Sequence, residues 1–456
     1  MADKPLLAGA AQVDITPALG TQIAGDIGRY RPAEEIRDPL YAKALVLEQG
    51  GKRVCLLSLD LLAMTDAYDA LLRAEAKKQY GLNPDALLVH ILQSHSAPSL
   101  GHLMVSDEYP IPEDLWWLRG GDDRYHPVAV AGILKAIGKA IARLQPVKVA
   151  AGRVTDGRVA FNRRVIMRDG TARTHPPGGS GDILCSEGPM DPEVAVVTFR
   201  GKTGRCVAAL LHHTCHPTHG YPQRWISADW PGAWSDGVKG VLGKQCVPLV
   251  INGFCGNVHH ANPLDATAHS TYPEMGRKLT ESTERALADM HPLEGAPLAF
   301  VTERVRFPLR RLTREELAGA KQIVRDNPEP MWRDETHESI LWEWVYAHAR
   351  LDLHQRTRRQ PWIDLVMQGF RVGELGLVAT PGEPFVQEQL RIKLKSPTPW
   401  TLVAHMCNGY AGYVPTPEAF RGGGYETWTC NGSQLQPNAL RIFGDTCLRF
   451  LNELFP

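Results

Sequence analysis

Short apolar runs and amphipathic helical patterns alternate along almost the whole chain of 456 residues. Apolar runs bounded by turn residues indicate buried strands, while apolar residues at three- and four-residue spacing indicate helices that face a core. An alternating order of strands and helices is typical of α/β proteins, in which helices cover sheets. We find no repeat, low-complexity tract or linker, so we predict a single domain over residues 1–456. Its fold class is α/β, with layered mixed sheets flanked by helices.

The expected elements can be placed by number. Strands are predicted over 6–13, 42–48, 54–59, 86–92, 147–154, 193–199, 207–211, 247–251, 299–305, 369–379 and 401–405. Helices are predicted over 66–80, 127–144, 232–242, 272–290, 314–326, 339–354 and 438–454. The stretch 169–192 is rich in glycine and proline, which predicts a loop.

Composition argues against several classes of partner. Fifty basic side chains balance fifty acidic ones, so no net field attracts nucleic acid or anionic lipid. Too few apolar residues follow Met1 to Pro5 for a signal peptide, and no later run approaches the length of a membrane span. We expect a cytoplasmic protein without a stable membrane anchor. Nine scattered cysteines without a Cys-x-x-Cys pair predict neither a disulfide framework nor a cysteine-built zinc site.

Polar segments follow several predicted strands. Four histidines follow strand 207–211, and a buried strand that ends in imidazoles delivers them to the rim of a sheet, where α/β proteins keep their chemistry. These histidines are His212, His213, His216 and His219. Imidazole, carboxylate and phenol groups are donors to zinc, and a zinc site with an open position turns bound water into a nucleophile. A purely structural role for the histidines stays open at this point.

A series of short motifs runs in order through nearly the whole chain. It includes Ser94-His95-Ser96-Ala97-Pro98, Cys215-His216-Pro217-Thr218 and Ser227-Ala228-Asp229-Trp230-Pro231-Gly232, together with residues 14–17, 37–44, 57–60, 381–383 and 412–416. The series resembles the catalytic domain of the neutral/alkaline non-lysosomal ceramidases. This resemblance implies the fold of that domain and a zinc amidase activity. Members of that family carry a further immunoglobulin-like domain, which we do not expect in a chain that ends soon after Tyr413.

The resemblance also implies the residues of the site. The four implied metal ligands are Gln93, His216, Glu383 and Tyr413. The three residues implied to contact substrate, which we predict to be catalytic, are His95, Arg163 and Tyr425. Gln93 stands where the family has a histidine, and an amide oxygen is a weaker zinc donor than imidazole. We therefore expect a zinc ion that is weakly held, replaced by another metal, or absent.

A second departure from the family pattern involves Asn257 and His259, which stand where the ceramidases have an acid and a serine. These changes make ceramide itself a doubtful substrate, and His259 or His260 is a candidate to replace the imidazole missing at Gln93. Asp60, at a strand end, is expected either to orient a ligand histidine or to be a simple strand-end acid.

Other conspicuous residues have ordinary explanations. Trp332, Trp342 and Trp344 have a spacing that predicts core packing, whereas Trp117 is expected to line a substrate mouth or to anchor a loop. No Gly-x-Ser-x-Gly motif is present, which disfavours a serine hydrolase.

These observations predict a zinc-dependent amidohydrolase that cleaves the N-acyl bond of a small-molecule or lipid-like amide. Two alternatives are a non-catalytic ligand-binding protein of the same fold, and a hydrolase of a sugar-type amide or an ester. The sequence does not indicate an oligomeric state.

Overall fold

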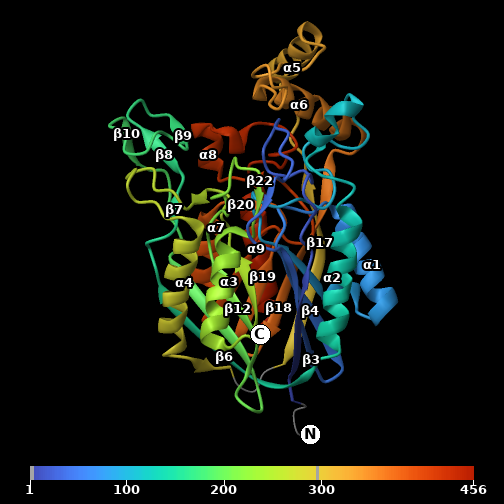
Figure 1. Cartoon of the computed structure of the whole chain (residues 1–456). Helices are drawn as coiled ribbons and strands as arrows, with labels where there is room; N and C mark the ends of the chain where they lie inside the picture. Colours follow the sequence, from blue (N-terminus) through green and yellow to red (C-terminus); the bar gives the residue numbers. More distant parts are fainter. Residues whose placement is uncertain (1–4, 294–296) are drawn as a thin grey trace.

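The computed structural model describes residues 5–293 and 297–456. In this part of the chain a nine-stranded sheet and a four-stranded sheet pack against one another, with helices on both outer sides (Figure 1). The larger sheet has the order β14 (Val247–Asn252), β12 (Cys206–His213), β11 (Glu193–Gly201), β6 (Gln145–Thr155), β1 (Leu7–Asp14), β3 (Tyr41–Gln49), β4 (Lys52–Leu59) and β5 (Leu87–Ile91), and β16 (His291–Pro292) pairs with β6. The smaller sheet has the order β17 (Leu298–Pro308), β18 (Trp362–Val372), β19 (Leu375–Ala379) and β21 (Trp400–Ala404).

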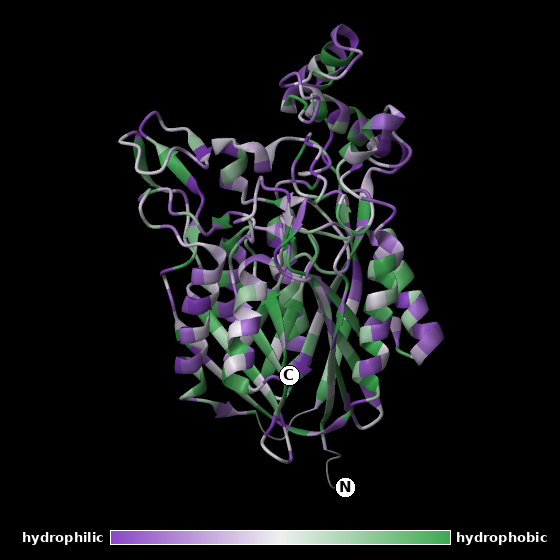
Figure 2. Cartoon of the chain, viewed as in Figure 1, coloured by the Kyte–Doolittle hydropathy of each residue, from purple (hydrophilic) through white to green (hydrophobic). Residues whose placement is uncertain are grey.

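The core between the two sheets explains why the strands are continuously apolar. Leu45 of β3 packs there with Phe370 and Leu402 of the smaller sheet. Successive residues of a strand point to opposite faces, so Val46 enters a second core beneath the helices instead. Since both faces are covered, neither face of β3 has to be polar. Figure 2 shows the result, with hydrophobic residues concentrated on the strands and hydrophilic residues on the outer helices.

Three pairs of helices cover the outer faces. They are α1 (Asp66–Tyr80) with α2 (His126–Ile141), α3 (Asp229–Leu242) with α4 (Tyr272–Leu287), and α7 (Val386–Lys395) with α9 (Ala439–Leu454). The fit of α2 on β1 is close, because a Cβ atom added at Gly9 would lie 2.1 Å from the carbonyl oxygen of Ala140. None of the described helices is both long and apolar enough to cross a membrane.

Parallel strand pairs determine where the loops gather. β4 and β5, β12 and β14, and β19 and β21 each run parallel, whereas the other neighbours in the two sheets are antiparallel. The carboxyl ends of parallel neighbours lie at the same edge of a sheet, which is the usual place for a site in α/β proteins. The segments that follow β5, β12, β14 and β19 are therefore brought together.

One long connection projects beyond the sheets. β17 and β18 are antiparallel partners, and the chain between them forms α5 (Arg314–Asp326) and α6 (Trp342–Arg359) at the top of Figure 1. Ala320 is the one residue of α5 that is buried, whereas α6 buries residues such as Trp344 and Tyr346. The outer helix is thus supported mainly by the inner one.

One ion pair lies inside the larger sheet. The Lys43 ammonium is 2.9 Å from Oδ1 of Asp60, and each side chain is 1% exposed. The second oxygen of Asp60 accepts a hydrogen bond from the backbone N–H of Tyr41 at 2.9 Å. Burial raises the pKa of Asp60, and the nearby charge of Lys43 opposes this rise.

The structure confirms the predicted fold class and most of the predicted elements. α1 and α5 begin and end at the predicted residues. The single strand predicted over 369–379 was wrong, because Gly373, with φ of 69°, makes a tight turn and separates β18 from β19. The loop predicted over 169–192 was wrong in part, since β9 (Ala172–Thr174) and β10 (Ile183–Ser186) both pair with β8 (Arg164–Met167). Residues 1–4, at the start of the segment judged for a signal peptide, lie outside the described residues.

Candidate active site

A cavity of about 490 Å³ lies where the strand-end loops meet. All seven residues that we selected from the sequence line it, although they come from segments that are far apart in the chain. They are Gln93, His95, Arg163, His216, Glu383, Tyr413 and Tyr425. Apolar residues line the cavity as well, among them Met104, Trp117 and Leu118.

Secondary structure fixes the positions of the two groups at the base of the cavity. His216 follows the end of β12, in the turn towards α3. Glu383 begins the two-residue strand β20 (Glu383–Pro384), which runs parallel to β22 (Tyr413–Val414), so Glu383 and Tyr413 are direct partners. Two residues that are thirty positions apart in sequence are therefore held side by side by backbone pairing.

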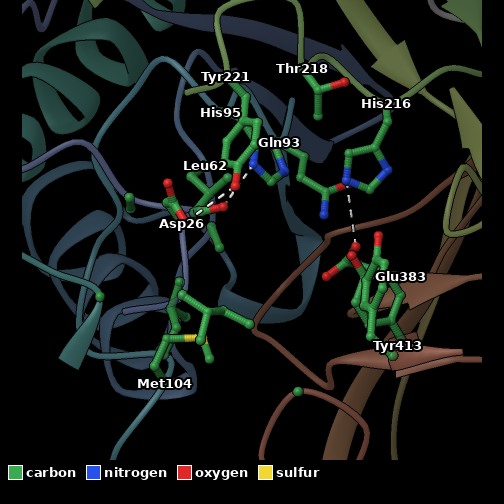
Figure 3. Close-up of a pocket in the computed structure, with 18 of the residues that line it drawn as sticks. Asp26, Leu62, Gln93, His95, Met104, His216, Thr218, Tyr221, Glu383 and Tyr413 are labelled. Atoms are coloured by element: carbon green, nitrogen blue, oxygen red, sulfur yellow. Dashed lines mark hydrogen bonds and ion pairs between the residues drawn. The ribbon is translucent and has the colours of Figure 1, made fainter. Parts of the chain in front are cut away.

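His216 and Glu383 face each other across a short gap, as Figure 3 shows. The Nε2 atom of His216 lies 3.6 Å from Oε2 of Glu383, and both atoms are buried without a hydrogen-bond partner among the described residues. The other carboxylate oxygen of Glu383 accepts a hydrogen bond from the Tyr410 hydroxyl at 2.9 Å. One carboxylate oxygen of Glu383 is thus occupied, and the other faces the ring of His216.

The tautomer of His216 follows from its second ring nitrogen. Nδ1 lies 3.1 Å from the carbonyl oxygen of Cys255, which can only accept, so Nδ1 carries the proton. Burial, together with the charge of Arg163, holds the pKa of His216 well below its usual range, so the ring is neutral. Nε2 therefore directs a lone pair at a carboxylate oxygen. Two acceptors that face each other at this distance are suited to a cation between them.

The strong metal donors around this gap are few. The part of the chain that the structure describes has no group of three or more His, Cys, Asp or Glu side chains that could hold a metal ion. One imidazole and one carboxylate are present, and the phenol of Tyr413 and the amide of Gln93 are the remaining predicted donors. Burial raises the pKa of Tyr413 well above its usual range, so its phenol oxygen stays protonated and is a weak metal ligand.

Arg163 supplies positive charge to the cavity. Its side chain is 3% exposed, and its Nε lies 3.2 Å from a carboxylate oxygen of Glu426. Its guanidinium lies 5.5 Å from the ring centre of Tyr413 and 5.5 Å from that of Tyr425. Nη2 is buried and has no hydrogen-bond partner among the described residues. An unpaired cationic donor of this kind suits an oxygen that becomes negative during a reaction.

His95 lines the cavity as a neutral imidazole. Its Nδ1 lies 3.0 Å from the carbonyl oxygen of Gly25, so Nδ1 carries the proton, and its buried Nε2 has no partner among the described residues. Burial and the charge of Arg31 lower the pKa of His95 to about 3. The neutral ring presents a lone pair, which suits an N–H or O–H group of a substrate better than a negative oxygen.

The other three histidines of segment 212–219 differ in position, since two are packed in the interior and one lines the cavity. His212 and His213 lie in the core, with ring nitrogens on the carbonyl oxygens of Val403 and Glu193. Their role is structural. His219, by contrast, lines the cavity.

His259 does not replace the imidazole that is missing at Gln93. Its Nδ1 accepts the backbone N–H of Ala261 at 3.0 Å, and its Nε2 lies 2.7 Å from the hydroxyl of Thr218. Both ring nitrogens are therefore occupied. Asp60 likewise contacts Lys43 and no histidine, so the expectation that it orients a ligand is not met.

Tyr410 and Trp342 line the cavity, although the sequence analysis did not place them there. Tyr410, which binds Glu383, lies in a loop without any periodic pattern. Trp342 lines the cavity and is 39% exposed, so the prediction of core packing was wrong for Trp342 and right for Trp344, which is 1% exposed. Trp117 lines the cavity, as one of the two expectations for it had stated.

Comparison with known proteins extends the fold assignment. No protein-family model matches the chain, and no curated protein matches it. The structure of neutral ceramidase from Pseudomonas aeruginosa matches with a TM-score of 0.74 and 19% identity, over 98% of this chain and 74% of that one. A ceramidase complexed with C2 matches with a TM-score of 0.72 and 17% identity, over 99% of this chain and 76% of that one. The chain therefore has the mixed α/β fold of ceramidase structures along nearly its whole length, as the motif series predicted.

Proposed function

We propose that this chain is a hydrolase of N-acyl amide bonds that works with a bound divalent cation, with zinc as the first candidate. The observation that carries the proposal is the gap between His216 and Glu383, where two buried and unpaired acceptor atoms face each other at 3.6 Å. The ceramidase fold supports it, since proteins with that fold include amidases. His216 and Glu383 would hold the ion, with Tyr413 and Gln93 as weaker donors.

The residues of the chain have distinct tasks in this proposal. When bound, a divalent cation supplies positive charge that polarises a carbonyl group and acidifies water. Arg163 binds the carbonyl oxygen as negative charge develops on it, and Tyr425 packs beside the Arg163 guanidinium. His95 accepts a hydrogen bond from an N–H or O–H group of the substrate. The apolar wall around Met104 and Trp117 takes the hydrocarbon part of a small-molecule or lipid-like amide.

Metal analysis of the untreated protein followed by a screen of N-acyl compounds tests this function. We expect about one divalent ion per chain, which is lost in His216→Ala and in Glu383→Ala and kept in His269→Ala, a change at an exposed histidine. We also expect release of an amine from at least one compound. Protein that binds no metal and gains nothing from added zinc would overturn the proposal.

Gln93 motivates a second candidate function, a binding protein that has lost its chemistry. With one imidazole and one carboxylate, the ion is held by fewer strong donors than zinc enzymes use. This candidate predicts that amides bind in the cavity without turnover, and a single hydrolysed compound excludes it. Whether the substrate is a lipid-like amide, a sugar-type amide or an ester would be decided by the same screen.

Replacing Gln93 with histidine should tighten zinc binding by about tenfold or more. Gln93 has a φ of 70°, in the left-handed region that histidine tolerates better than most residues, so the change does not add backbone strain. Its side chain is buried beside Cys255, close to the gap. Competition with a zinc-selective dye measures the affinity. If Gln93→His binds zinc no more tightly than the parent protein, Gln93 is not at a ligand position.

A further inference from the structure

A second pair of residues in the same cavity has the form of a catalytic acid–base unit. His219 lines the cavity, and its side chain is 5% exposed. Its Nδ1 lies 2.7 Å from Oδ1 of Asp229, whose side chain is fully buried. Its Nε2 is buried and has no hydrogen-bond partner among the described residues. One ring nitrogen is therefore held by a carboxylate and the other is unused.

The structure holds Asp229 firmly as an ionised carboxylate. Oδ2 accepts the backbone N–H of His219 at 2.8 Å, and Oδ1 accepts that of Trp230 at 2.6 Å. Burial by itself would raise the pKa of Asp229, but the contact with His219, the nearby His260 and the hydrogen bond from the N–H of Trp230 together outweigh it, so the pKa lies below its usual value. Asp229 also has a φ of 56°, a conformation in which a non-glycine residue is uncommon and which directs a functional side chain in many sites.

An ionised carboxylate can only accept hydrogen bonds, so it fixes the tautomer of His219. Nδ1 must carry the proton, and the unpartnered Nε2 keeps its lone pair. The ring of His260 stacks on that of His219 with centroids 3.6 Å apart, which restricts its orientation. His95 and His216 differ from His219, because a backbone carbonyl and not a carboxylate supports the inner nitrogen of each. A carboxylate stabilises the imidazolium form far better than a neutral carbonyl does.

We propose that His219, oriented by Asp229, is a general acid–base residue that carries the proton to the leaving nitrogen in amide hydrolysis. This inference rests on the proposed function. As a water oxygen bonds to the carbonyl carbon, one water proton passes to Nε2 of His219. The same proton then passes to the amide nitrogen as the carbon–nitrogen bond breaks, which gives a carboxylic acid and an amine. Asp229 remains ionised throughout and acts as a positioning residue.

Two substrates with different leaving groups distinguish a proton-transfer role of His219 from a purely structural one. An amide nitrogen needs a proton in order to leave, whereas a nitrophenolate leaves without one. The two probes are octanoyl-aminomethylcoumarin, an amide, and p-nitrophenyl octanoate, an ester, each assayed with zinc present. In His219→Gln we expect kcat for the amide to fall about 100-fold, because both proton transfers are lost. We expect kcat for the ester to fall by a smaller factor, because only the transfer from water is lost. His269→Gln, at an exposed histidine outside the cavity, should change neither.

Asp229→Asn gives a second test, because asparagine can donate to His219 and reverse its tautomer. We expect amide turnover to fall with little change in KM. The nitrogen-15 NMR shifts of labelled histidine should show the proton on Nδ1 of His219 in the parent protein and its displacement in Asp229→Asn. The NMR measurement needs no substrate, and a proton on Nε2 in the parent protein would overturn the inference.

The outcomes distinguish the two proposals. If the parent protein cleaves the amide and His219→Gln reduces amide and ester turnover equally, His219 does not deliver the proton to the leaving nitrogen, and the proposed function stands. If the parent protein cleaves neither these probes nor any compound of the N-acyl screen, the proposed function fails, and the role of His219 fails with it.

Discussion

Arg163→Met should lower kcat for an amide substrate by about 100- to 1,000-fold while the protein stays folded. The substitution removes the unpaired Nη2 atom, which we assign to the carbonyl oxygen as it becomes negative. Glu426 keeps partners after the change, because Arg164 and the hydroxyl of Thr174 bind its other oxygen at 2.9 Å and 2.8 Å. Steady-state kinetics on the substrate found in the N-acyl screen measure the effect.

Arg168→Met is the matched control for this change. Arg168 lies five positions further along the chain, is exposed and binds the carbonyl oxygen of Gly181, so its loss should leave kcat unchanged. Thermal unfolding of both variants shows whether the fold is intact. A folded Arg163→Met protein with normal kcat would contradict the assignment of Arg163 to the developing charge.

Lys43→Met should lower the free energy of unfolding by about 3–5 kcal/mol, because it leaves the Asp60 carboxylate buried without its counter-charge. The effect should depend on pH. Burial raises the pKa of Asp60, and without Lys43 nothing of equal size opposes it. For a carboxyl group whose folded-state pKa is raised, the penalty is complete above that pKa and declines as the pH falls through it.

Denaturant titrations at several pH values measure this loss. Lys43→Met with Asp60→Leu should recover part of the stability, since no charge then remains buried. Arg306→Met is the control, because the Arg306–Asp364 pair is largely exposed and its loss should have a far smaller effect. If the loss in free energy of unfolding instead grew as the pH fell, the buried charge of Asp60 would not be its cause.

Local patterns were sufficient to predict the architecture. Strands such as β3 are buried on both faces, and helices such as α1 have one apolar side, so each has a pattern of its own. The pattern failed at the turn around Gly373, because apolar residues continue on both sides of it. The helix α7 was not predicted, because it begins directly after Glu383 and Pro384, which were interpreted as a strand end.

The site could be predicted as a set of residues, but not as a set of roles. The motif series selected His95, His216 and Glu383, and all of them line one cavity. What the series could not supply was the partner of each ring nitrogen, and the partner decides whether an imidazole donates or accepts. Only the structure places Asp229 behind His219 and Gly25 behind His95.

The connection between β17 and β18 contributes to the cavity a wall that belongs to neither sheet. Pro308 and Trp362 are direct partners in the antiparallel register, so the excursion that leaves the sheet at one returns at the other. A short turn could join these two residues without disturbing any strand. This excursion carries Trp342 and Tyr346 into the cavity. Substitutions in it can therefore alter the shape of the cavity, and with it the preferred substrate, without moving the residues proposed to react.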